Sequence, residues 1–291
     1  MRLCKLPGGA QMPVLGLGTW RMGESARSRS AEVAAVRTAI GLGYRLIDTA
    51  EMYGDGGAEE VIGLALAEAL RAGDVRREEL YIVSKVYPHN ASRNGTPAAC
   101  ERSRTRLGLD HIDLYLLHWR GQHALQDTCE AMLALLGQGR IRNWGVSNFD
   151  TADLQELQQV EQDLGIAGGA QCCAANQVYY SLSTRGPEFS LLPWQRARGM
   201  PLMAYSPIDQ GALAGAPVLQ SLAHEHGRSA AQMALAWVLA QPGVVAIPKA
   251  VREAHLRENL DAAAWELPPE AMAALQSAFA PPRRKSPLAM L

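Results

Sequence analysis

The sequence predicts an α/β fold, a closed (β/α)₈ TIM barrel, from three observations. Eight short apolar runs alternate with longer helix-like segments along the 291 residues, which is close to the size of one such barrel. The alternation shows no composition break or linker, so residues 1–291 are expected to form a single domain. Three successive apolar runs finish at polar, titratable side chains, as at the C-terminal rim of a barrel. An open, doubly wound sheet is the alternative fold.

An N-terminal β-hairpin is expected first, within residues 1–14. Gly8 and Gly9 separate two short extended pieces there, and such a glycine pair is typical of a hairpin turn. The eight barrel strands should follow in the short apolar runs. These runs are residues 15–19, 45–48, 80–85, 113–118, 143–147, 174–177, 202–205 and 244–248.

Helix-like segments separate these strands. They are residues 30–42, 58–70, 97–107, 126–136, 151–164, 190–198 and 230–239. Ser229, with Gln232 three residues on, forms a capping-box pattern before the last segment. Gly43, Gly139 and Gly199 stand where three of the helices should stop.

Two extra C-terminal helices, 252–262 and 269–279, are expected after the last strand, followed by a short tail at 280–291. The tail holds the sharpest basic cluster of the chain, Arg283, Arg284 and Lys285. Prolines flank this cluster, and we interpret it as a solvated segment.

The composition argues against several classes of partner. The net charge of −1 leaves no basic footprint for nucleic acid or an anionic membrane. No apolar run approaches the roughly 18 residues of a membrane span, and the N-terminus shows none of signal-peptide length. The five cysteines are an odd number without CxxC spacing, and reduced thiols are expected. These features together favour a cytoplasmic protein.

No metal site is expected. His118, His123 and Asp127 lie close in sequence, but their spacing matches no compact ligand set. The adjacent Cys172 and Cys173 would point to opposite faces if they lay on a strand, which argues against a shared metal.

Four polar residues stand at or just past the ends of separate strand candidates: Asp48, Tyr53, Lys85 and His118. We interpret them as one proton-handling group, the acid cluster. A phenol, an amine, a carboxylate and an imidazole can together form a tunable proton donor. Each residue alone has a plainer explanation, such as a turn cap for Asp48 or a buried histidine for His118. Because all four occur together at three consecutive strand ends, a catalytic role is favoured over these separate structural roles.

Six short motifs resemble those of the aldo-keto reductase family, in that family's order and over nearly the whole chain. They are residues 16–20, 46–54, 84–86, 116–119, 145–148 and 247–249. Within the family, the chain resembles bacterial reductases of the methylglyoxal-reducing kind. The resemblance implies a (β/α)₈ barrel, a nicotinamide cofactor, usually NADPH, and reduction of carbonyls to alcohols.

The chemistry of the four residues is consistent with the roles that this resemblance implies. Hydride addition to a carbonyl creates an alkoxide, so an acid must supply a proton. A phenol titrates near pH 10, and we expect the ammonium of Lys85 to lower the pKa of Tyr53. Tyr53 is therefore the expected proton donor, Asp48 the support for Lys85, and His118 the residue that orients the carbonyl oxygen.

The resemblance also implies a set of cofactor-binding residues. Ser147, Asn148 and Gln177 would bind the nicotinamide amide, Tyr205 would stack on its ring, and the residues after Tyr205 would follow the pyrophosphate. The full set is Gly18, Thr19, Trp20, Asp48, Ser147, Asn148, Gln177, Tyr205, Ser206, Pro207, Ile208, Lys249, His255, Glu258 and Asn259.

The phosphate end departs from the family pattern. Lys249 matches the lysine that commonly meets the 2′-phosphate of NADPH, but Ala250 replaces a serine or threonine and His255 replaces an arginine. An imidazole lacks the guanidinium's fork and is only partly charged near neutrality. Arg252 or Arg257 would have to compensate. NADPH is the expected cofactor, with NADH also possible.

The substrate is expected to be a small carbonyl compound: an aldehyde, an α-oxoaldehyde such as methylglyoxal, or a diketone. Trp20, Tyr87 and Trp119 follow strand ends and should form aromatic walls beside Tyr53 and His118. Twelve residues remain after residue 279, which is short for a long closing loop, so a shallow pocket is expected. A monomer is the expected state. The alternative function is a non-catalytic, nucleotide-binding regulatory module.

Overall fold

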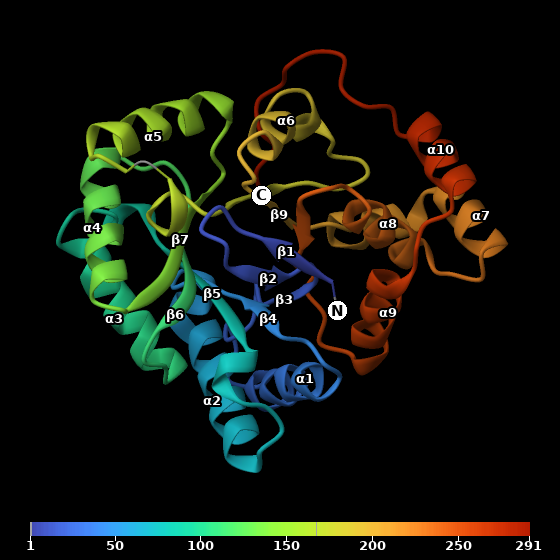
Figure 1. Ribbon diagram of the computed structural model, residues 1–291. Coiled ribbons are helices and arrows are strands. Elements are labelled where there is room, and N and C mark those ends of the chain that lie inside the picture. The colour runs from blue at the N-terminus through green and yellow to red at the C-terminus, as the bar shows by residue number, and fades with distance from the viewer. Residues whose placement is uncertain (1, 167) are drawn as a thin grey trace.

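The computed structural model describes residues 2–166 and 168–291, in which a parallel sheet is surrounded by helices (Figure 1). Eight strands pair in chain order from β3 to β10, and every pair is parallel. They are β3 (Gly16–Gly18), β4 (Leu46–Asp48), β5 (Tyr81–Val86), β6 (Ile112–Leu117), β7 (Ile141–Ser147), β8 (Asn176–Tyr179), β9 (Leu202–Tyr205) and β10 (Val244–Ala246).

The sheet closes on itself between its first and last strands. Parallel bridges join Leu15 to Ala246 and Gly18 to Lys249. Glycine is needed at position 18, because a Cβ there would lie 2.5 Å from the carbonyl oxygen of Ile247. A closed ring in sequential order confirms the predicted barrel and excludes the doubly wound sheet, whose strand order would reverse partway.

The N-terminal hairpin is confirmed and lies against the barrel interior. Strands β1 (Leu3–Lys5) and β2 (Gln11–Pro13) pair antiparallel, and Gly9 takes the left-handed φ of 85° that such a turn requires. Leu6 and Met12 are buried in one cluster with apolar side chains of the barrel strands.

Ten α-helices are described. They are α1 (Arg29–Gly41), α2 (Gly57–Ala72), α3 (Gly95–Leu107), α4 (Leu125–Gly137), α5 (Thr151–Asp163), α6 (Leu191–Arg196), α7 (Pro217–Glu225), α8 (Ala230–Leu239), α9 (Glu253–Ala264) and α10 (Pro269–Ala278). The capping box before α8 is confirmed, because Ser229 Oγ accepts from the Gln232 N–H at 3.2 Å. Gly43, Gly139 and Gly199 all have left-handed φ after α1, α4 and α6, as helix stops do.

Two local predictions need correction. The sequence reasoning missed α7, a second helix between β9 and β10. Strand β8 begins at Asn176, two residues later than predicted. Cys172 and Cys173 do not lie on a strand, so the argument from opposite strand faces does not apply to them. Their thiols nevertheless diverge, since Cys172 Sγ bonds to the Gly169 carbonyl and Cys173 Sγ to that of Ala175.

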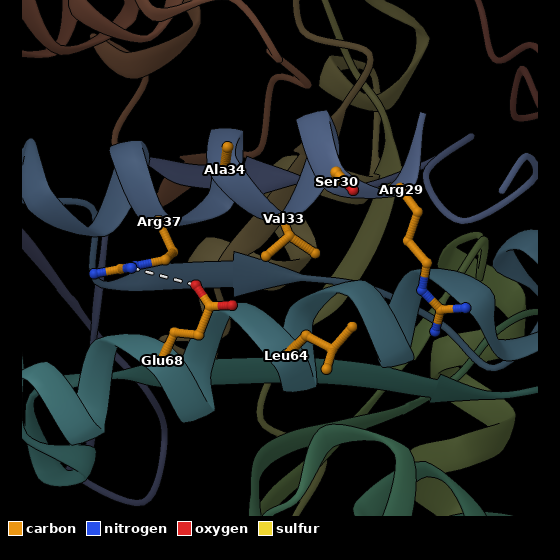
Figure 2. Close-up of a pocket in the computed structure, with 7 residues that line it drawn as sticks. All are labelled: Arg29, Ser30, Val33, Ala34, Arg37, Leu64 and Glu68. Atoms are coloured by element: carbon orange, nitrogen blue, oxygen red, sulfur yellow. Dashed lines mark hydrogen bonds and ion pairs between the residues drawn. The ribbon is translucent and has the colours of Figure 1, made fainter. Parts of the chain in front are cut away.

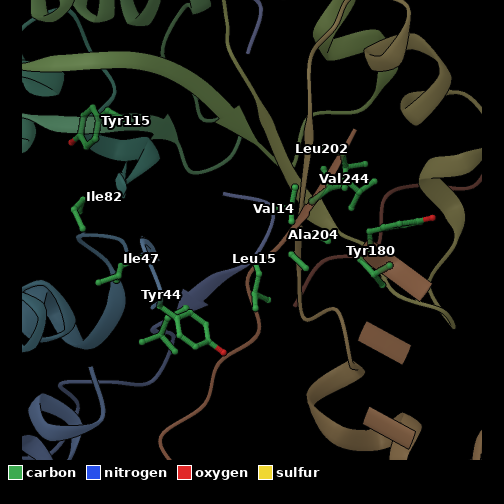
Figure 3. Close-up of a cluster of buried hydrophobic side chains, with 14 of the residues drawn as sticks. Val14, Leu15, Tyr44, Ile47, Ile82, Tyr115, Tyr180, Leu202, Ala204 and Val244 are labelled. Carbon is green, nitrogen blue, oxygen red and sulfur yellow. The ribbon is translucent and has the colours of Figure 1, made fainter. Parts of the chain in front are cut away.

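The main core lies between the strands and the helices (Figure 3). Ile47, Ile82 and Tyr115 contribute from β4, β5 and β6, and Leu202 and Val244 contribute from β9 and β10. A second cluster of apolar side chains, which includes Leu46, Val83 and Leu114, fills the inside of the barrel. Since successive strand residues point to opposite faces, these alternating positions are the pattern of a packed barrel.

The C-terminal tail runs from α10 back toward the middle of the barrel (Figure 1). Arg283, Arg284 and Lys285 are exposed, as expected, but Lys285 Nζ also lies 3.3 Å from Asp150 Oδ2. Leu288 packs against the main core. The tail is therefore held to the barrel at two points. In the described part of the chain, no helix combines the length and apolar character that crossing a membrane requires.

Candidate active site

A cavity of about 600 Å³ opens at the C-terminal ends of the strands. It brings together three of the four acid-cluster residues and most of the residues expected to bind cofactor or substrate. The predicted residues that line it are Gly18, Thr19, Trp20, Asp48, Tyr53, His118, Trp119, Ser147, Asn148, Gln177, Tyr205, Ser206, Pro207, Ile208, Lys249 and His255.

Lys85 is fully buried and lies at the centre of the acid cluster. Its Nζ donates to Asp48 Oδ2 at 2.7 Å, to the Thr49 carbonyl at 2.8 Å and to the Tyr53 hydroxyl at 3.2 Å. These three acceptors satisfy the three N–H donors of an ammonium group. The ammonium is therefore fully partnered and held against the phenol.

Chain geometry after β4 places Tyr53 within reach of Lys85. Strand β4 ends at Asp48, and Tyr53 begins a short 3₁₀ turn, Tyr53–Gly56. Gly54, Asp55 and Gly56 follow with left-handed φ of 57°, 55° and 90°. This run of left-handed residues turns the chain sharply into α2, which begins at residue 57.

Burial is the largest single influence on the pKa values of Tyr53 and Lys85. It raises the pKa of the Tyr53 phenol, and the Lys85 ammonium opposes that rise without reversing it. The ammonium thus acts in the expected direction, but desolvation outweighs it, so the net shift of the Tyr53 pKa is upward. Burial acts to lower the pKa of Lys85, but the nearby Asp48 and Tyr53 raise it overall. Tyr53 is accordingly a neutral phenol and Lys85 a cation near neutral pH.

His118 is placed to act as a neutral hydrogen-bond donor. Burial and the charge of Lys85 hold the pKa of its imidazole well below 6.5. Its Nδ1 is buried and has no hydrogen-bond partner among the described residues, while the residue lines the cavity. Because a buried N–H without an acceptor is costly, the proton is favoured on Nε2, the ring nitrogen that remains accessible.

The amide-bearing residues form one hydrogen-bonded wall. Gln177 Nε2 donates to Asp48 Oδ1 at 2.8 Å, so the acceptor that this amide can turn to the cavity is its side-chain oxygen Oε1. Asn148 Nδ2 donates to Ser147 Oγ and to the His118 carbonyl, both at 3.2 Å. The Tyr205 hydroxyl donates to Asn148 Oδ1 at 3.0 Å. These contacts link the amide wall to the acid cluster through Asp48.

The far end of the cavity carries positive charge. Lys249 is exposed there, in a parallel bridge with Gly18. Arg252 Nη2 lies 2.7 Å from His255 Nε2. Arg257 instead pairs with Glu253 Oε1 at 2.6 Å. Arg252 is thus the arginine that accompanies His255.

Four predicted residues do not line the cavity. Lys85 lies behind Tyr53, and Tyr87 packs edge-on against Trp119 with ring centroids 5.1 Å apart. The Glu258 carbonyl accepts from Gln232, and Asn259 is buried beside the Tyr44 hydroxyl. Adenine contacts by these last two residues stay a prediction.

Several lining residues were missed by the sequence reasoning. They are Arg21, Met52, Gln210, Gly211, Ile247, Pro248, Met290 and Leu291. Arg21 follows the 16–20 motif directly, with its guanidinium 4.5 Å from the Trp20 ring centroid, so position alone could have suggested it. Met290 and Leu291 carry no local signal, because only the path of the tail brings them to the cavity.

A second cavity, of about 430 Å³, lies between α1 and α2 (Figure 2). Its charged side chains are already paired: Arg37 contacts Glu68 and Asp74, and Arg29 contacts Glu60. It holds none of the predicted site residues. Within residues 2–166 and 168–291, no group of three or more His, Cys, Asp or Glu side chains is placed to hold a metal ion.

Comparisons with known proteins point to one family. The model of the aldo/keto reductase family matches residues 14–280. The chain is 48% identical over 296 residues to the methylglyoxal reductase YeaE of Escherichia coli (strain K12), covering 100% of this chain and 99% of that protein. It is 38% identical to the glyoxal reductase of Bacillus subtilis (strain 168), with 92% and 89% covered. A crystal structure of an aldo-keto reductase from Klebsiella pneumoniae in complex with NADPH matches with a TM-score of 0.90 and 43% identity, covering 100% and 99%.

Proposed function

This chain belongs to the aldo/keto reductase family, and we propose that it reduces small aldehydes and ketones to alcohols with NADPH, using Tyr53 as the proton donor. The observation that carries the proposal is the fully partnered Lys85 ammonium beside the Tyr53 hydroxyl, at the floor of the cavity. The reductases among its relatives favour this function over a non-catalytic regulatory module.

The residues present fit a nicotinamide cofactor. The side-chain oxygen Oε1 of Gln177 and the polar groups of Ser147 and Asn148 have the chemistry to bind a carboxamide, and Tyr205 offers a flat ring. Lys249 supplies a cation for a phosphate group. When bound, the cofactor supplies the hydride. Arg252 beside His255 adds a guanidinium near Lys249, which supports NADPH over NADH.

Tyr53 gives up its proton as negative charge develops on the substrate oxygen. Its raised pKa keeps the phenol protonated in the ground state, so the acid is in its active form across neutral pH. An alkoxide is far more basic than a phenolate, and the transfer is therefore downhill. Lys85 then stabilises the phenolate that remains, because its ammonium already lies 3.2 Å from that oxygen.

His118 orients the carbonyl oxygen toward Tyr53. The two rings meet edge to face with centroids 5.7 Å apart, so one oxygen atom can be shared between the phenol and the accessible imidazole nitrogen. A neutral imidazole donates a hydrogen bond without adding a second positive charge beside Lys85.

The substrate class follows from the walls of the cavity. Trp20, Met52, Trp119 and Met290 give the cavity lining large apolar side chains. Such a surface suits small aldehydes and α-oxoaldehydes. Because relatives are named methylglyoxal and glyoxal reductases, these α-oxoaldehydes are the substrates we propose first.

We also propose a cytoplasmic monomer. All five cysteines are free thiols, which is typical of a reducing compartment. Outside the cavity, the exposed large apolar side chains that the structure describes, such as Leu64, Phe189 and Val218, lie on separate parts of the chain. The molar mass measured by light scattering after size-exclusion chromatography would test whether the protein is a monomer.

The direct test is Tyr53→Phe. The variant keeps the aromatic ring but lacks the proton donor, so reduction of methylglyoxal, followed as loss of NADPH absorbance, should fall by about 10²–10⁴-fold. NADPH should still bind, as measured by quenching of protein fluorescence. A near-normal rate would exclude Tyr53 as the acid, and a wild-type protein that reduces no carbonyl compound would refute the proposed function.

A further inference from the structure

A buried carboxylate outside the acid cluster ties together two loops at the rim. Glu51 lies between Asp48 and Tyr53 and is only 8% exposed. Its Oε1 accepts from the Tyr87 N–H at 2.7 Å and from Asn90 Nδ2 at 3.0 Å. Its Oε2 accepts from Arg102 at 3.2 Å. Hydrogen bonds to an ionised carboxylate are among the stronger ones in proteins, so this side chain fastens the loop after β5 to the loop after β4.

The loop after β5 supports one wall of the cavity. The Tyr87 ring packs edge-on against Trp119, with centroids 5.1 Å apart, and Trp119 lines the cavity. The carbonyl of His89, in the same loop, lies 3.1 Å from His123 Nε2. The contacts thus run in series from the Glu51 carboxylate to Tyr87 and on to Trp119. A shift of the loop would move the Tyr87 ring, and with it the edge-to-face contact that supports Trp119.

The acid cluster does not depend on this carboxylate. Lys85 Nζ is fully used by Asp48, Thr49 and Tyr53. Glu51 reaches Lys85 only through the main chain, where its N–H donates to the Lys85 carbonyl at 3.3 Å. Removing the side-chain carboxylate therefore releases the wall and leaves the proton donor in place.

We propose that Glu51 is a positioning residue that sets the location of the Trp119 wall through Tyr87, and thereby the preference of the enzyme between bulky and small aldehydes. This inference rests on the proposed carbonyl reduction.

The test compares two substrates in three proteins. The three proteins are the wild type, Glu51→Ala and Glu51→Gln, and kcat/KM is measured in each for two aldehydes. One is 4-nitrobenzaldehyde, whose ring needs the Trp119 wall, and the other is methylglyoxal, which is small. In Glu51→Ala the ratio of the two values should fall about tenfold, the scale of one lost apolar contact in a pocket. In Glu51→Gln the ratio should stay near the wild-type value, because the amide oxygen still accepts from Tyr87 and Asn90. The alkaline limb of the pH profile should be the same in all three proteins.

Glu59 provides a matched control. It is a buried glutamate on α2 whose partners, Ser84 Oγ at 2.6 Å and Arg106 at 3.0 Å, are not among the cavity-lining residues. Glu59→Ala should lower stability while leaving the substrate ratio unchanged. A loss of folded enzyme lowers both rates by one factor, so it cannot produce a changed ratio.

Asn90→Asp keeps the inference testable if Glu51→Ala fails to fold. Asn90 is half-buried, and a carboxylate there would repel Glu51 and displace the same loop. The ratio should again fall. Equal losses for both aldehydes in Glu51→Ala, a Gln variant as impaired as the Ala variant, or an unchanged ratio in Asn90→Asp would each overturn the inference. A wild type that reduces neither aldehyde would instead refute the proposed function.

Discussion

Individual residues of the site are held by more than one partner, and Asp48 shows this most clearly. One of its oxygens accepts from Lys85 and the other from Gln177, at 2.7 and 2.8 Å. The same carboxylate therefore holds the cation beside the proton donor and fixes which end of the Gln177 amide faces the cavity. The acid and the expected carboxamide site share this one support.

The neutral state of His118 predicts a pH effect on stability. Its folded-state pKa lies well below 6.5, whereas the unfolded chain takes up a proton as the pH falls through about 6.5. The unfolded state then binds more protons, and the free energy of unfolding should fall by up to about 1.4 kcal/mol per pH unit below that value. Urea unfolding between about pH 5 and 7 should show a shallower dependence in His118→Gln than in the wild type. Identical slopes would contradict a neutral, buried imidazole, since the other titrating groups are common to both proteins.

Which residues act could be predicted from the sequence better than where their side chains point. Asp48 ends β4, Lys85 is the last residue but one of β5, and His118 follows β6, so the barrel itself brings them to one rim. The direction of Tyr87 could not be predicted, because it depends on a loop held by Glu51. The net pKa direction of Tyr53 was also out of reach, since it depends on how completely the phenol is buried.

At the scale of elements, the closing contact between β3 and β10 should be sensitive to size. A Cβ at Gly18 would lie 2.5 Å from the Ile247 carbonyl oxygen, which belongs to the backbone and cannot rotate away. Gly18→Ala should therefore destabilise the protein by about 1–3 kcal/mol, the usual cost of overpacking. Gly41→Ala is the matched control, because a Cβ at Gly41 in α1 would meet no described atom within 4 Å apart from its own helix. It should be neutral or stabilising by up to about 1 kcal/mol. Equal urea midpoints for the two variants would show that the closing strands can separate freely.

Strands and helices of the repeating unit were predictable because each carries a local pattern and stop signals. Helix α7 was missed because it breaks the rule of one helix after each strand. The tail is a different case. Met290 and Leu291 reach the cavity through contacts such as Lys285 with Asp150 and Leu288 with the core, and no local pattern announces such long-range contacts.

For the whole molecule, cofactor binding in the cavity should increase the stability of the fold. A ligand that binds only the folded protein stabilises it by RT ln(1 + [L]/Kd), about 2.7 kcal/mol at a hundredfold excess over Kd. NADPH should therefore raise the melting temperature, and its advantage over NADH measures what the 2′-phosphate contributes. Exposed Lys249, with Arg252 and His255 nearby, is the proposed source of that advantage.

Lys249→Met tests this linkage without touching the acid cluster. The side chain is exposed, so the fold without cofactor should melt at the wild-type temperature. The stabilisation by NADPH should shrink markedly because one charge opposite the phosphate is gone, whereas the stabilisation by NADH should stay nearly constant. The measurement is the melting temperature of the wild type and the variant, each alone and with NADPH or NADH at equal concentration. The rise in melting temperature that each cofactor causes is then compared between the two proteins. Equal losses for the two cofactors would show that Lys249 acts on a part that they share, and the 2′-phosphate would then have to meet Arg252 and His255 instead.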